Sequence, residues 1–308
     1  MNAILFPGQG TQIVGMGLEF YNNFKIAKEI FAIADERLNF KISKLILEGP
    51  EDELKLTQNT QPAILTVSYA IFSVLKNEFN FKLDATKFFA GHSLGEYSAL
   101  VCAESLKFND ALFLLFERGK AMQEVVPLGK GNMIAILGLS IDEIKNLIKK
   151  INTNGVCEIA NDNSAGQTIV SGDIESINLL QSILKENNKK FIQLNVSAPF
   201  HCSLMKPAAE IMKNKINSVV FKKPLFNIVS NVTSKSENNP ENIKELLIKQ
   251  IYSTVKWRES IINIHNEKVD DFIEIGPGKV LTGMVKRTLK NINCFSINSI
   301  DDIKKINK

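Results

Sequence analysis

Short apolar runs alternate with longer segments of helical periodicity along most of this chain. Two of the runs, residues 3–6 (AILF) and 88–90 (FFA), are too short and too uniformly apolar to form amphipathic helices. Buried strands of a parallel sheet have this form, because helices cover both faces of such a sheet and leave no polar side. The alternation therefore predicts an α/β fold in which helices cover a mostly parallel sheet.

The composition is that of a globular protein. Hydrophobic residues make up 44% of the 308 residues and charged residues 23%, which excludes a disordered, collagenous or coiled-coil chain. A chain of this length also buries a core without disulfide staples. The formal net charge of +4 is too small to indicate a nucleic-acid-binding protein, so we expect no nucleic acid partner. A mild positive charge is still compatible with an acidic protein partner.

The cysteines are widely spaced and form no Cys-x-x-Cys pair; they are Cys102, Cys157, Cys202 and Cys294. This spacing predicts free thiols in a reducing compartment, with no disulfide framework and no metal site. The N-terminus lacks a basic segment followed by a long apolar stretch, and no apolar run reaches the roughly 20 residues that span a bilayer. We therefore expect a cytoplasmic protein with no membrane partner.

A compact unit is predicted inside the chain. Ser140 and Glu143 have the spacing of a capping box that opens a helix. The expected elements are a strand at 132–139, a helix at 141–151, strands at 156–160 and 167–170 joined by a turn at 161–166, a helix at 174–186 and a strand at 191–196. This β-α-β-β-α-β order is that of a ferredoxin-like domain. We expect this small domain at 127–197, inserted in a large α/β catalytic domain made of residues 1–126 and 198–308.

The segment Gly91-His92-Ser93-Leu94-Gly95 carries the strongest chemical signal. It follows a short apolar run and precedes a helix-like segment at 96–106, so a strand, a sharp turn and a helix come in the order of a nucleophile elbow. The glycines let the strand and the helix pack closely around a strained turn, which exposes the Ser93 hydroxyl at the start of the helix. The segment therefore predicts Ser93 as a nucleophile, with an ordinary glycine-rich turn as the alternative.

A nucleophilic serine needs a base, and the chain contains three histidines. His92 adjoins the serine, and neighbouring side chains in a tight turn diverge. His265 lies in a helical stretch and is expected at the surface. His201 follows the last strand of the small domain, next to a proline, where a chain reversal would place it between the two domains. We predict His201 as the general base, with a pKa near the reference value of about 6.5, and a buried structural histidine as the alternative.

Arg118 shares the apolar face of a predicted helix at 108–126. Its neighbours at positions minus four, minus three and plus four are Leu114, Leu115 and Met122. A buried guanidinium keeps its proton and requires a partner. That partner is either an acidic side chain of the protein or the carboxylate of a substrate, which the planar fork of arginine matches well. The residues alone leave both alternatives open.

Six blocks of sequence, taken together, resemble the malonyl-CoA:acyl-carrier-protein transacylase family of fatty-acid synthesis. The blocks are 6–10 (FPGQG), 91–97 (GHSLGEY), 118–123 (RGKAMQ), 200–201 (FH), Gln250 with Trp257, and 274–281 (EIGPGKVL). The resemblance runs from residue 4 to about residue 290, and six blocks in the right order are far more specific than any single motif. It implies an α/β-hydrolase-like large domain with a ferredoxin-like insertion, which agrees with the predicted pattern of elements.

The resemblance also implies a role for individual residues. Ser93 would attack a thioester, and His201 would accept and return the proton. Arg118 would bind the malonyl carboxylate as the substrate-binding residue. The backbone N–H groups of Gln9 and Leu94 would form the oxyanion hole for the tetrahedral intermediate.

The implied reaction moves a malonyl group from malonyl-CoA to the phosphopantetheine thiol of acyl carrier protein through a malonyl ester of serine. Gln250 would orient the histidine through its backbone carbonyl, in place of the carboxylate of a hydrolase triad. Malonyl-CoA and acyl carrier protein are the implied partners, and we expect no cofactor and no metal. A serine thioesterase or other hydrolase of acyl thioesters, and a noncatalytic carrier-binding scaffold, are the alternatives.

Overall fold

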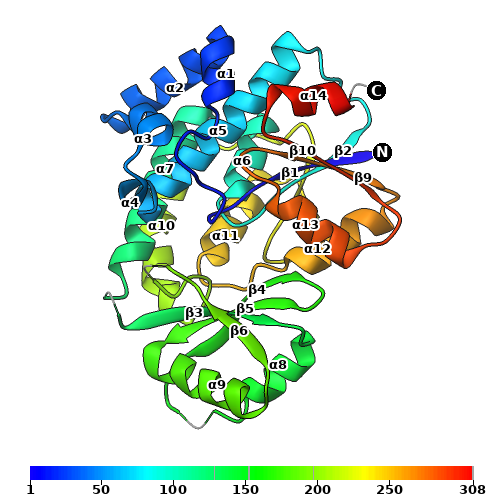
Figure 1. Cartoon of the computed structure of the whole chain (residues 1–308). Coiled ribbons are helices and arrows are strands. Elements are labelled where there is room, and N and C mark those ends of the chain that lie inside the picture. Colours follow the sequence, from blue (N-terminus) through cyan, green and yellow to red (C-terminus); the bar gives the residue numbers. More distant parts are fainter. Residues whose placement is uncertain (128, 152, 197, 307–308) are drawn as a thin grey trace.

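The computed structural model describes residues 1–306 except residues 128, 152 and 197. The strands form two separate sheets, and each sheet has its own helices (Figure 1). In the view of Figure 1 the larger sheet lies in the upper half of the molecule and the smaller sheet in the lower half. The α/β fold that the sequence predicts, a large unit with a small insertion, is confirmed.

Within the described residues, the larger sheet has six strands in the order β10-β9-β1-β2-β7-β8. The strands are β1 (Asn2–Phe6), β2 (Thr86–Gly91), β7 (Asn227–Val229), β8 (Ser236–Glu237), β9 (Asp271–Ile275) and β10 (Asn293–Ile297). All neighbours are parallel except β7 and β8. Leu5 pairs with Ala90, and Ala90 pairs with Val229, so the carboxyl ends of β1, β2 and β7 meet. Ligands of open α/β sheets bind at this edge.

Helices cover both faces of the larger sheet. The helices of this unit are α1 (Leu18–Asn23), α2 (Lys25–Leu38), α3 (Ile42–Glu48), α4 (Glu51–Leu54), α5 (Thr57–Glu78), α6 (Gly95–Cys102), α7 (Phe108–Glu124), the 3-10 helix η1 (Ser203–Met205), α10 (Lys206–Asn217), α11 (Pro240–Gln250), α12 (Trp257–Asn266), α13 (Val280–Thr288) and α14 (Ile300–Ile306). Helices α5 and α6 pack on one face, and α12 and α13 pack on the other. No helix in the described ranges is both long and apolar enough to cross a membrane.

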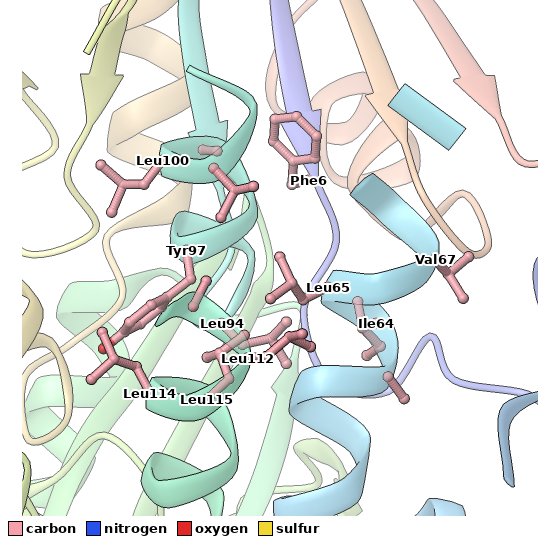
Figure 2. Packing of buried hydrophobic residues seen from close by; sticks show 14 of the residues in the cluster. Phe6, Ile64, Leu65, Val67, Leu94, Tyr97, Leu100, Leu112, Leu114 and Leu115 are labelled. Atoms are coloured by element: carbon pink, nitrogen blue, oxygen red, sulfur yellow. The ribbon is translucent and has the colours of Figure 1, made fainter. Parts of the chain in front are cut away.

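A hydrophobic core lies between α5, α6 and α7. Figure 2 shows Leu94 near Leu112 and Leu115 of α7, with Leu65 of α5 across from them and the Tyr97 ring directed toward Leu114. All of these side chains are buried. Because burial of each such side chain is worth about 1.5–3 kcal/mol, this contact fixes α7 firmly against the turn that precedes α6.

The smaller sheet has the strand order β4-β5-β3-β6, and every neighbouring pair is antiparallel. Its elements are β3 (Gly131–Leu137), α8 (Ile141–Ile148), β4 (Cys157–Ser164), β5 (Gln167–Asp173), α9 (Ile174–Glu186) and β6 (Lys190–Gln193). The predicted ferredoxin-like order is confirmed, and Ser140 and Glu143 form the predicted capping box. The predicted limits at 127 and 197 stay predictions, and residues 128, 197, 307 and 308 of the predicted ranges lie outside the described residues.

The turn predicted at 161–166 is too long: β4 continues to Ser164, so only residues 165 and 166 turn before β5 begins at Gln167. The polar residues of this segment are held extended by contacts with the larger unit. The Asp162 backbone N–H donates to the carbonyl oxygen of Val255 at 3.0 Å, and the Asp162 carboxylate binds Arg258. A local pattern of turn-forming residues does not reveal such distant partners, so the tertiary contacts override it.

Candidate active site

Ser93 stands in a tight turn between β2 and α6. Its φ of 53° is a left-handed conformation that residues with a side chain rarely adopt. Hydrogen bonds hold the residue on both sides: its N–H donates to Asn231 Oδ1 at 2.7 Å, and its carbonyl accepts from Gln250 Nε2 at 3.0 Å. A Cβ on Gly91 would overlap with the backbone of Gly95, so the strand and the helix approach this closely only with glycine. The turn therefore has the geometry of a nucleophile elbow.

His201 lies between the serine and α11. Its Nε2 is 2.8 Å from Ser93 Oγ, and its Nδ1 is 2.8 Å from the backbone carbonyl oxygen of Gln250. A carbonyl oxygen only accepts hydrogen bonds, so Nδ1 carries the proton of the neutral ring. The Nε2 atom is then the acceptor for the Ser93 hydroxyl, which is the arrangement of a serine with a base beside it.

The pKa of His201 is lowered to about 3. Burial is the largest cause, and the positive charge of Arg118 acts in the same direction, whereas the hydrogen bond to Gln250 opposes them. The expected pKa near 6.5 is therefore wrong, because the sequence does not show that the imidazole is buried beside a guanidinium. A ring with this lowered pKa is neutral at physiological pH, so its Nε2 is available to accept a proton.

The other two histidines have partners elsewhere. His92 is half-buried, its Nε2 lies 2.9 Å from Asn163 Oδ1, and its ring packs edge-on against Trp257. Burial lowers the pKa of His92. The Nδ1 of His265 lies 3.0 Å from the carbonyl oxygen of Val269, near the surface. These contacts agree with the reasoning that set both histidines aside as the base.

Arg118 is buried on α7 and reaches the serine. Its Nη1 donates to Gln61 Oε1 at 2.7 Å, and its Nη2 donates to Gln250 Oε1 at 2.9 Å and to Ser93 Oγ at 3.1 Å. In the part of the chain that the structure describes, no acidic side chain forms an ion pair with Arg118, and its Nε has no hydrogen-bond partner. Of the two alternatives for its partner, the described residues therefore supply no protein carboxylate in direct contact with the guanidinium.

Neutral amides and one buried acid complete the site, and the sequence did not single them out. Glu96 Oε2 accepts from Gln250 Nε2 at 2.7 Å and from the backbone N–H of Asn231 at 3.1 Å. Asn231 Nδ2 also donates to the carbonyl of Gly91 at 2.7 Å. These contacts join residues that are 57 to 154 positions apart in the sequence. No local pattern therefore marks Gln61, Glu96 or Asn231, although Glu96 belongs to the block 91–97.

Gln9 and Leu94 lie at the same end of the sheet as the serine. The loop that carries Gln9 follows β1 and lies against the elbow, since a Cβ on Gly8 would be only 2.6 Å from the His92 carbonyl oxygen. Leu94 is the residue before α6, and the first N–H groups of a helix have no acceptor within the helix. Both backbone N–H groups therefore belong to segments that border Ser93.

The geometry provides a nucleophile, a neutral base and a guanidinium held by amides, all at one edge of the sheet. No group of three or more His, Cys, Asp or Glu side chains in the described ranges is arranged to hold a metal ion. Such a site is suited to acyl transfer onto a serine, with an anionic group of the acyl chain near Arg118.

Comparisons with known proteins place the chain in a family. The acyl transferase domain family matches residues 4–306. The malonyl CoA-acyl carrier protein transacylase of Bacillus subtilis (strain 168) is 44% identical over 98% of this chain and 94% of its own. The protein of that name from Escherichia coli (strain K12) is 39% identical over 96% of this chain and 95% of its own.

A solved structure agrees with these relatives. The acyl-carrier-protein-S-malonyltransferase from Bartonella henselae superposes with a TM-score of 0.96 at 39% sequence identity, and the match covers 99% of this chain and 98% of that one. A malonyl-transacylase in complex with a type II PKS acyl-carrier protein superposes with a TM-score of 0.95 at 38% identity, over 99% and 98% of the two chains. The resemblance indicated by the six sequence blocks is confirmed, and the chain belongs to the acyl transferase family, within the group of malonyl CoA-acyl carrier protein transacylases.

Proposed function

We propose that this protein transfers the malonyl group from malonyl-CoA to the phosphopantetheine thiol of acyl carrier protein. The observation that carries the proposal is the Ser93 hydroxyl, which lies within hydrogen-bond distance of both His201 and Arg118. A serine beside a base serves many acyl transfers, whereas the buried guanidinium adds a site for a free carboxylate. Malonyl and acetyl thioesters differ in that carboxylate. The names of the relatives point to the same reaction.

In the first half of the reaction, the serine takes the acyl group from coenzyme A. As Ser93 Oγ attacks the thioester carbonyl carbon, its proton passes to His201 Nε2. The Gln250 carbonyl accepts a hydrogen bond from Nδ1–H and so stabilises the imidazolium. When the carbon–sulfur bond breaks, the proton moves from His201 to the departing coenzyme A sulfur. The product is a malonyl ester on Ser93 and free coenzyme A.

The second half runs in the opposite direction with a different thiol. His201 takes the proton of the phosphopantetheine thiol, whose sulfur attacks the ester carbonyl. The carbon–oxygen bond to Ser93 then breaks, and the proton returns from His201 to Ser93 Oγ. The thioester already carries an activated acyl group, so the proposed reaction needs no cofactor.

Backbone and side-chain donors stabilise the charges that develop. The N–H groups of Gln9 and Leu94 would bind the oxyanion of each tetrahedral intermediate, a contribution of roughly 3–4 kcal/mol for one donor in comparable sites. Arg118 would bind the malonyl carboxylate through its guanidinium. Holding the acyl chain at its far end would keep the ester in place for the second thiol.

A hydrolase is the second candidate function, because the same serine and base also serve thioesterases. The two reactions differ in their products. We expect a mixture of the protein, malonyl-CoA and phosphopantetheinyl carrier protein to yield malonyl carrier, detected as a mass increase by intact-protein mass spectrometry. Peptide mapping after a brief incubation without carrier should place the malonyl group on Ser93, and Ser93→Ala should remove it. Free malonate as the main product in the presence of carrier would instead identify a hydrolase.

A noncatalytic carrier-binding scaffold is the remaining alternative. The elbow, the neutral base and the guanidinium lie within hydrogen-bond distance of one another, which a scaffold does not require. The same mass spectrometry experiment tests it, because a scaffold would bind the carrier without acquiring a malonyl ester on Ser93.

The cytoplasm is the compartment that we propose. The cysteines Cys102, Cys157, Cys202 and Cys294 all have free thiols, as expected for a reducing environment. We also keep residues 127–197 as the proposed small domain, with 1–126 and 198–308 as the large one. Separate expression of 127–197 would test these limits, since a folded domain should give a cooperative unfolding transition.

The carrier is proposed to approach along β6, the edge strand of the smaller sheet. Phe191 packs with the helices of that sheet, so its neighbours Lys190 and Ile192 point to the opposite face. Both are exposed, as is Lys189. The Lys286–Arg287 pair is a second candidate, and Arg287 contacts Ser164 and Gln167 of the smaller sheet.

A further inference from the structure

Two buried ionisable side chains, Glu96 and Arg118, lie in the site without a direct hydrogen bond between them. Glu96 is 2% exposed and Arg118 is 1% exposed. The side-chain amide of Gln250 lies between them: its Oε1 accepts from Arg118 Nη2 at 2.9 Å, and its Nε2 donates to Glu96 Oε2 at 2.7 Å. One amide thus connects the guanidinium to the carboxylate.

The surroundings leave few other groups to balance either charge. The titratable groups nearest Glu96 are Arg118 on α7 and Tyr97 on its own helix. His201 lies beside Arg118 and Gln250, and His92 acts on His201 from the elbow. Helices α5 and α11 contribute neutral amides. Both histidines have lowered pKa values, and that of Tyr97 is raised to about 12, so none of the three is charged near neutral pH.

We propose that Glu96 is the counter-charge of Arg118 in the free enzyme, and that Glu96 takes up a proton when a substrate carboxylate binds to the Arg118 guanidinium. This inference rests on the proposed function and extends it. A directly paired acid would occupy the N–H groups that the substrate needs, whereas an acid behind an amide compensates the charge and leaves the guanidinium open.

Electrostatics gives the direction of the coupling. A second anion at Arg118 competes with Glu96 for the same positive charge, so the protonated form of Glu96 becomes more favourable. Burial already raises the pKa of Glu96 to about 7, against the opposing effects of its hydrogen bonds and of Arg118. Substrate binding raises that pKa further. By linkage, the malonyl group binds more tightly at a pH where Glu96 is already protonated.

The coupling is measured by calorimetry on a Ser93→Ala variant, which binds malonyl-CoA without reacting. Titrations at pH 7.5 in phosphate and in Tris buffer give the number of protons taken up, and acetyl-CoA provides the reference for the shared coenzyme A part. If binding raises the pKa of Glu96 by one unit, malonyl-CoA should take up about half a proton more than acetyl-CoA. Its Kd should rise about tenfold between pH 6 and pH 9, with no such rise for acetyl-CoA.

Substitutions assign the proton to Glu96. Glu96→Gln, added to Ser93→Ala, keeps an acceptor oxygen for Gln250 and removes the charge. The extra proton uptake should disappear, and the Kd for malonyl-CoA should stay at its low-pH value throughout. Glu274→Gln is the matched control, because Glu274 is equally buried but accepts from the backbone of α13. This control should keep the extra proton uptake.

The outcomes separate this inference from the proposed function. Equal proton uptake with malonyl-CoA and acetyl-CoA would overturn the inference but leave the proposed function intact. This comparison uses only the Ser93→Ala variant, so it remains available if Glu96→Gln does not fold. A Kd raised at every pH in Glu96→Gln would also overturn it, since that result would mean a purely structural role. Failure of the unsubstituted protein to bind malonyl-CoA or to form the ester would overturn the proposed function together with the inference.

Discussion

Arg118 and Arg258 show two uses of a guanidinium within one molecule. Arg258 on α12 binds the carboxylate of Asp162 on β4 through Nε at 2.9 and 3.0 Å and through Nη2 at 2.8 Å. Arg118 is more deeply buried, yet its hydrogen bonds run to Gln61, Gln250 and Ser93. The ion pair raises the pKa of Arg258, whereas burial lowers that of Arg118.

The difference teaches how to interpret a buried cation. An arginine in a bidentate ion pair already has its anion, and here the pair joins α12 of the larger unit to β4 of the smaller sheet. An arginine that is surrounded by neutral amides is positioned but not neutralised by direct contact, which leaves the guanidinium able to bind an external carboxylate. Substitutions in the site around Arg118 should therefore affect catalysis, and substitutions in the Arg258–Asp162 ion pair should affect stability.

Among substitutions in the site around Arg118, His201→Ala is expected to have the largest effect on acyl loading. Without the base, the Ser93 hydroxyl keeps its proton during attack, and acyl loading should fall by about 10³-fold or more. Stopped-flow or quenched-flow measurement of ester formation on Ser93 would show it, with circular dichroism to establish that the fold is retained. Unchanged loading in His201→Ala would mean that another group is the base.

The lowered pKa of His201 adds a pH test in the unsubstituted protein. A histidine whose folded pKa is depressed to about 3 stays unprotonated as the pH falls, and its function as a base is lost only as the pH approaches that value. Acetyl loading, which does not involve a carboxylate at Arg118, should therefore show no decrease between pH 8 and pH 5. A decrease centred near pH 6.5 would contradict the lowered pKa.

Arg118→Ala should change the acyl preference. Loss of a buried, charged hydrogen bond to the carboxylate is expected to cost malonyl loading about 2–5 kcal/mol. Acetyl loading lacks this contact and should be maintained or should increase, so the ratio of the two kcat/KM values is the informative quantity. If the kcat/KM values for malonyl and acetyl loading fell by the same factor, Arg118 would be a structural residue. Its contrast with Arg258 would then disappear.

The opposite result is expected for Arg258→Ala. This change leaves the Asp162 carboxylate, 7% exposed, without its partner, and should lower the free energy of unfolding by about 1–3 kcal/mol. The value should lie toward the low end, because the Arg258 side chain is 32% exposed and solvent screens the pair. Urea denaturation measures the loss, while the ratio of malonyl to acetyl loading should not change. A shift in that ratio would show that both arginines affect the substrate.

Much of the fold could be predicted from the sequence because its signals are local. The capping box at Ser140 and Glu143, and the helix over Ile174–Glu186, follow from neighbouring residues. The turn expected at 161–166 was too long, because Val255 and Arg258 hold its first residues in β4 from a distance. Local propensity does not encode such partners.

The same distinction applies to the site. The block around Ser93 is local, so the elbow could be predicted. The burial of Arg118 could also be predicted, because the residue lies on the apolar face of its helix. The role of Glu96 could not, because it depends on Gln250, which lies 154 positions away. The lowered pKa of His201 was also out of reach, since it depends on burial beside Arg118. Sequence patterns identify residue types, whereas folding determines their electrostatic environment.

The smallest effect is expected from exposed lysines, which neither form a buried pair nor face a buried carboxylate. Lys189→Glu with Lys190→Glu reverses the charge at the start of β6, on the proposed carrier surface. Exposed charges act mainly by steering, so the apparent KM for an acidic carrier should rise several-fold at low salt and much less at high salt. Loading of Ser93 from malonyl-CoA should change little.

A matched pair in the same unit tests whether position or net charge is responsible. Lys149 and Lys150 are also adjacent and exposed, but they lie at the end of α8, on the helix-covered face of the smaller sheet. Charge reversal there changes the net charge equally, so an effect of net charge alone would appear in both double variants. Docking along β6 requires the Lys189–Lys190 variant to lose more carrier affinity at low salt. Equal responses of the two variants to salt would remove β6 from the docking surface, and the Arg287 side of the smaller sheet would become the next surface to test.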